Sequence, residues 1–121
     1  MLYSDEEFKL FSEELEGSSI GTVWSAMSPD NFGREALSYE EKKAYFLELL
    51  QRLIQEGRIK LASRGNFLKG TVEEQIALYR DAFPKNQEEM EDGAFDGFWF
   101  LTEKCPAGIV WVHENGYLDW T

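Results

Sequence analysis

Apolar side chains recur at helical spacing in several parts of the chain. In four stretches they return every three to four positions, which places them on one face of a helix. The predicted helices cover residues 5–16, 20–27, 39–56 and 72–83. A further helical turn or two is predicted over residues 88–92, inside an acid-rich stretch. Nearly half of the chain is therefore expected to be helical.

Polar residues at the predicted helix starts support these boundaries. Ser4, Ser38 and Thr71 each stand three residues before a glutamate, which is the pattern of a capping box. Asn86 predicts a weaker cap of the same kind. Acidic residues in a first helical turn also interact favourably with the helix dipole. Helix ends alone thus explain part of the acidity of this chain.

The hydrophobic period changes near the C-terminus. Residues 98–102 and 109–113 are rich in aromatic and β-branched side chains and predict two strands, while alternation in residues 58–62 predicts a third. Asn115-Gly116 is a favoured two-residue hairpin turn.

A type I′ turn at that position would pair Trp111 with Trp120 and His113 with Leu118. Together these elements predict an α+β fold, with about four helices followed by a small C-terminal antiparallel β-sheet. A chain of 121 residues is expected to form a single domain over residues 1–121.

Composition predicts a cytoplasmic protein without a membrane span. Cys105 is the single cysteine, which excludes an internal disulfide and fits a reducing compartment. The first residues carry acids where a signal peptide would carry bases. The longest apolar run has only four residues, far fewer than a membrane-spanning helix needs.

The sequence shows no constellation typical of catalysis or of metal and cofactor binding. His113 is the single histidine, and its place in a predicted strand favours a half-buried structural role over general-base work beside Glu114 or a pair with Cys105. One cysteine and one histidine cannot build a structural zinc centre. The acids between Glu88 and Asp96 lack the ligand spacing of a calcium loop. We therefore expect a protein that is not an enzyme and has no cofactor.

The distribution of charge points to protein binding instead. Residues 1–37, 38–85 and 86–121 carry charges of −6, +2 and −7, which together give the net charge of −11. Four basic residues fall within residues 58–69, but the net charge disfavours binding to nucleic acid. A strongly acidic surface attracts a basic partner, and the five acids of residues 86–96 adjoin an aromatic stretch that could anchor one.

The predicted partner-binding residues are therefore the acids of this segment: Glu88, Glu89, Glu91, Asp92 and Asp96. A second acidic patch is predicted at Asp5, Glu6 and Glu7. The alternative interpretation is that these acids form a solvated helix face and that the neighbouring aromatic residues belong to the core.

Three stretches of the chain resemble a family of small bacterial proteins known as domain of unknown function 596. They are Leu49–Ala62, Gly70–Pro84 (in its Gly70–Ile76 and Ala82–Pro84 parts), and Phe98–Tyr117 (in its Phe98–Thr102 and Cys105–Tyr117 parts). These motifs consist of caps, turns and sheet residues, and the resemblance transfers no functional residues. Small acidic proteins of this sort are similar to immunity proteins of polymorphic and contact-dependent toxin systems.

That likeness implies a protein that neutralises a cognate toxin domain, for example a nuclease, in the cytoplasm of the cell that produces it. The alternative from the same residues is an adaptor or regulatory protein with a non-toxin partner. The oligomeric state is left open by the sequence.

Overall fold

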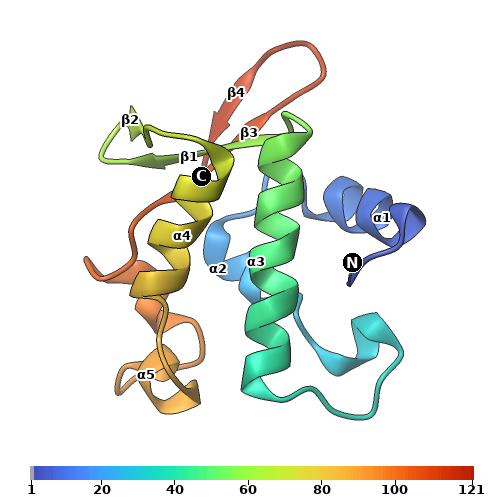
Figure 1. Ribbon diagram of the computed structural model, residues 1–121, viewed down its shortest axis with the longest axis vertical. Helices are drawn as coiled ribbons and strands as arrows, with labels where there is room; N and C mark the ends of the chain where they lie inside the picture. The colour runs from blue at the N-terminus through green and yellow to red at the C-terminus, as the bar shows by residue number, and fades with distance from the viewer. Residues whose placement is uncertain (1) are drawn as a thin grey trace.

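The computed structural model describes residues 2–121 as a layer of helices packed against one curled sheet (Figure 1). The helices are α1 (Asp5–Leu15), α2 (Ile20–Ser25), α3 (Tyr39–Gln55), α4 (Val72–Ala82) and α5 (Gln87–Glu91), with 3₁₀ helices η1 (Pro29–Phe32) and η2 (Phe98–Leu101). The strands are β1 (Ile59–Ser63), β2 (Asn66–Phe67), β3 (Gly108–Val112) and β4 (Leu118–Trp120). The predicted α+β class is confirmed.

The four strands form one antiparallel sheet in the order β2-β1-β3-β4. It lies across one end of the α3–α4 pair, with α1 beyond α3 and α5 at the far end of α4 (Figure 1). The predicted 58–62 strand does join the C-terminal hairpin, because Ile59 of β1 pairs with Trp111 of β3. The short strand β2 was not predicted.

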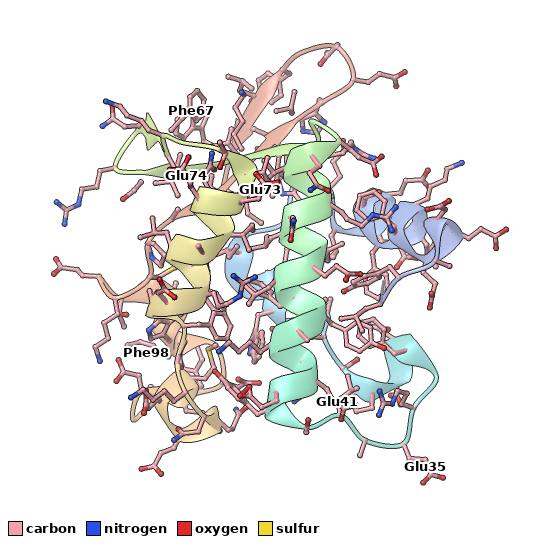
Figure 2. All side chains as sticks on the ribbon, in the orientation of Figure 1. Glu35, Glu41, Phe67, Glu73, Glu74 and Phe98 are labelled. Atoms are coloured by element: carbon pink, nitrogen blue, oxygen red, sulfur yellow. The ribbon has the colours of Figure 1, made fainter. Side chains whose placement is uncertain are left out.

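The predicted helices are confirmed to within one or two residues, because local signals set their ends. Complete capping boxes join Ser4 to Glu7, Ser38 to Glu41 and Thr71 to Glu74. Since α3 and α4 run antiparallel, Glu41 and Glu74 lie at opposite ends of the helix pair (Figure 2).

Aromatic side chains dominate the core. Trp24 is 2% exposed, and its ring centroid lies 5.7 Å from that of Phe46 and 5.6 Å from that of Phe83. Tyr79 and Trp111 are fully buried, so α4 and β3 close the same core from two sides. Side chains from α2, α3, α4 and the sheet thus meet in a single cluster.

The prediction of a strand over residues 98–102 is wrong, because these residues form η2. A strand would point Trp99 and Phe100 to opposite faces. In η2 both side chains are buried and their ring centroids lie 5.1 Å apart. The tight turn therefore buries two consecutive large rings, which outweighs their preference for a strand.

The predicted register of the C-terminal hairpin is also wrong, by one residue. The structure pairs Val110 with Trp120 and Trp111 with Asp119. A type I′ turn needs positive φ at both central residues, whereas only Gly116 has it in this loop, at φ 86°. The loop is one residue longer than predicted, with the N–H of Gly116 donating to the carbonyl of His113 at 2.8 Å.

The positive-φ pair that a type I′ turn requires occurs instead between β1 and β2. Arg64 and Gly65 have φ of 53° and 81°, and Ser63 pairs with Asn66 across them.

Within residues 2–121, each helix is too short or too polar to cross a bilayer.

Candidate protein-binding surface

The acidic segment, residues 86–96, is a short helix followed by a tight turn. Asn86 caps α5 by accepting from the N–H of Glu89 at 2.8 Å. Met90 is fully buried and holds the helix to the core. The helix stops at Asp92, which adopts a left-handed conformation at φ 44°. Glu88, Glu89 and Asp96 are exposed on this short, anchored unit, whereas Glu91 and Asp92 are half-buried.

Three of the five predicted binding residues share one surface. Glu88, Glu89 and Asp92 line the same shallow cleft, together with Asn86 and Gly93. Glu91 does not line this cleft, and its carboxylate accepts from the side-chain amide of Gln87 at 2.9 Å.

Asp96 also lies apart from that cleft. Its Oδ1 accepts from the indole Nε1 of Trp24 at 3.0 Å. The structure thus brings three of the five residues together, and places Asp96 at a neighbouring groove.

Most hydrogen bonds to these carboxylates come from neutral donors. Glu89 accepts from the backbone N–H of Lys85, not from its ammonium group, at 3.3 Å. Among residues 2–121, the one cation that pairs with any of the five acids is Lys104, whose Nζ lies 3.2 Å from Asp92 Oδ1. A neutral donor orients a carboxylate without cancelling its charge, so most of the negative charge remains directed at solvent.

The second predicted acidic patch lies elsewhere. Asp5, Glu6 and Glu7 begin α1, which lies on the opposite side of α3 from α5 (Figure 1). Asp5 pairs with Arg52 at 3.2 Å, and Glu7 completes the capping box of α1. The two predicted patches therefore do not form one surface, and local structural roles occupy much of the second one.

A mostly apolar groove of about 410 Å³ adjoins the acidic segment. It is lined by residues of α2, the turn after α5 and η2, together with Gly108 at the start of β3 and Thr121 after β4. Phe95 and Leu101 are 53% and 73% exposed there, while Asp96 stands among the lining residues. Large apolar side chains left in solvent beside charged ones are typical of protein-binding sites.

Leu101 was not among the predicted site residues because residues 98–102 were interpreted as a strand. Phe95, Phe98 and Leu101 recur every third residue, which is the repeat of a 3₁₀ helix. That spacing was the available signal. Figure 2 shows Phe98 at the end of the molecule that carries α5.

A second, larger cleft of about 930 Å³ lies between the end of α1 and the β3–β4 hairpin. His113 is held there between two carboxylates, with Nε2 3.1 Å from Asp119 Oδ2 and Nδ1 3.5 Å from Glu16 Oε1. Arg58 adds a contact to Glu16 at 3.7 Å. These contacts join α1 to the hairpin, as expected for a half-buried structural histidine.

Cys105 is not placed to act with His113, because the five residues of β3 separate them. Its Sγ lies 3.0 Å from the Tyr79 hydroxyl. Burial raises the pKa of the Cys105 thiol, which disfavours the reactive thiolate. Among residues 2–121, no three His, Cys, Asp or Glu side chains are grouped to hold a metal ion.

Fold and surface together define a small α+β protein in which an acidic segment adjoins a mostly apolar groove. Residues 54–121 match the model of a family described as a protein of unknown function, DUF596. The match covers more than half of the chain, which therefore belongs to this bacterial family, as its sequence motifs suggested.

The fold is similar to that of a solved protein from Neisseria meningitidis, described as an uncharacterized protein conserved in bacteria. The two chains are 27% identical, with a TM-score of 0.77 over 95% of this chain and 87% of the other. No curated protein matches this sequence.

Proposed function

We propose that this protein is a non-catalytic immunity protein, which binds a basic toxin domain through the acidic segment and blocks its action. The observation that carries the proposal is the uncompensated charge of that segment. Within the described residues 2–121, one cation pairs with these five carboxylates: Lys104, which contacts Asp92. A domain of this size bears self-repulsion from such charge, and a basic partner relieves it.

A nuclease is the toxin class that fits this surface best. Nuclease active sites are basic because they hold phosphate groups. A rigid array of carboxylates that docks at such a site would bind the same basic groups as the phosphates of the substrate, and would thereby exclude the substrate. Opposite charges also speed encounter, with association rate constants reaching ~10⁸ M⁻¹s⁻¹ at low salt.

Co-expression with a toxin domain encoded by the neighbouring gene tests the proposal. The wild-type protein is expected to protect the cells. A Glu88→Gln/Glu89→Gln variant should protect less, because it removes two charges while keeping the oxygen that accepts from Lys85.

The matched control is Glu14→Gln/Glu73→Gln on α1 and α4, which changes the net charge equally at exposed positions outside both predicted patches. This control should protect as well as the wild type. Binding without protection would favour an adaptor role. If the protein neither binds the toxin domain nor protects the cells, the proposal is contradicted.

A further inference from the structure

The groove between α2 and η2 has the form of an anchor site next to the acidic segment. We propose that it receives one large apolar side chain of the basic partner, and that a lysine or arginine beside that side chain pairs with Asp96. This inference rests on the proposed function and specifies the chemistry of the partner: an apolar residue flanked by cations.

Phe95, an exposed apolar side chain of the groove, is held in place by its neighbours. Phe95 packs edge-on against Phe98, with ring centroids 5.2 Å apart. The N–H of Phe98 donates to the carbonyl of Phe95 at 2.9 Å, which closes the turn between them. Gly97 lies within this turn at φ 94°, a conformation that side-chain-bearing residues rarely adopt. An ordered apolar surface loses little conformational entropy when a partner binds, which favours its use as an anchor.

Asp96 determines the charge of the ligand that fits. Its Oδ1 is held by the Trp24 indole, whereas its Oδ2 has no hydrogen-bond partner among residues 2–121. The carboxylate is thus fixed at the groove with one oxygen available to a cation. Charge-assisted hydrogen bonds from lysine or arginine are the strong partners of such an oxygen.

The same charges disfavour a second copy of this chain as the occupant. Each copy carries a net charge of −11, and self-association at the groove would bring two acidic segments towards each other. A cationic partner meets no such repulsion. Charge complementarity therefore selects a basic protein segment over a homodimer.

Two synthetic peptides separate the anchor from the charge attraction. Both are capped pentapeptides with two lysines on each side of a central residue, which is tryptophan in one and glycine in the other. Each is titrated into the full-length ¹⁵N-labelled protein while backbone amide shifts are followed. Both peptides should shift the amides of α5, and the tryptophan peptide alone should also shift those of Thr22, Gly97 and Leu101.

A Leu101→Ser variant should weaken binding of the tryptophan peptide by about fivefold to tenfold, since it removes exposed apolar contact area. Leu78→Ser is the matched control, because Leu78 is 48% exposed on α4, outside the groove. It should change binding by less than about twofold.

The outcomes distinguish the two proposals. Equal affinity and equal shifts for both peptides would overturn the anchor site while leaving the charge attraction intact. If neither peptide shifts the backbone amides of α5, the charge attraction on which the proposed function depends is contradicted.

Discussion

Asp96 contributes both to the stability of the fold and to the proposed binding surface, and two different substitutions of Asp96 separate these roles. Its carboxylate accepts from the indole of Trp24, a side chain that is 2% exposed in the centre of the core. Asp96→Ala removes the acceptor and leaves the indole N–H without this partner. Asp96→Asn keeps an oxygen acceptor and removes the charge.

The structure sets the size of the expected loss. Hydrogen bonds to charged groups contribute about 1.5–3 kcal/mol, and an unpaired buried donor costs about 1–3 kcal/mol. Because Asp96 itself is exposed, water can reach the vacated position. We therefore expect Asp96→Ala to lower the free energy of unfolding by about 1–2 kcal/mol, and Asp96→Asn by less than about 1 kcal/mol.

Thermal unfolding followed by tryptophan fluorescence measures the difference. For a domain of this size the predicted loss lowers the Tm of Asp96→Ala by about 4–8 °C. The control is Glu88→Ala, since no hydrogen bond to the Glu88 side chain occurs in the described part of the chain, and its Tm should stay within about 2 °C of the wild type. If Asp96→Ala unfolds at the wild-type temperature, the Trp24 bond does not stabilise this fold and the reasoning is refuted.

Three further predictions concern the free protein. Burial raises the pKa of Tyr79 and of Cys105, so the folded state holds protons that the unfolded state releases. The stability that these two groups contribute should be intact below about pH 8.5 and decline above it. Equal urea midpoints at pH 8 and pH 10.5 would contradict this. Because the net charge of −11 repels itself, raising NaCl from about 20 to 300 mM should raise the Tm, whereas a fall would mean that internal ion pairs dominate. Gly97→Ala should lower the free energy of unfolding by about 1–2 kcal/mol, because φ at Gly97 is 94°. Gly21→Ala in α2, where an added Cβ meets open space, should be neutral or stabilising in the same urea titration. Equal stability of the two variants would exclude backbone strain at Gly97.

The helices could be predicted from sequence because their determinants are local. Ser38 and Glu41 lie three residues apart and together define the start of α3 whatever the rest of the chain does. Apolar spacing then indicated the buried faces. The same holds for the acidic segment, because its cap at Asn86 could be predicted from the sequence.

The errors occurred where distant packing decides the local conformation. Phe98–Leu101 has the composition of a strand, yet burying Trp99 and Phe100 together against the core requires a 3₁₀ turn. Asn115-Gly116 fits a two-residue turn, but the observed loop is longer and moves each cross-strand pair by one position.

Part of the candidate site also depends on contacts that sequence spacing cannot show. The bond between Trp24 and Asp96 joins residues 72 positions apart, and it decides which predicted acid faces the groove. The separation of Asp5–Glu7 from the acidic segment likewise follows from the placement of α1 beyond α3 (Figure 1).

The association rate constant with the neighbouring toxin domain, measured by stopped-flow fluorescence at low and high salt, tests the central claim most directly. We predict that it falls at least about tenfold between 20 and 300 mM NaCl. Glu88→Gln/Glu89→Gln should lower it at low salt, while Glu14→Gln/Glu73→Gln should leave it unchanged. A rate constant that is insensitive to salt and equal in both variants would contradict attraction through the acidic segment.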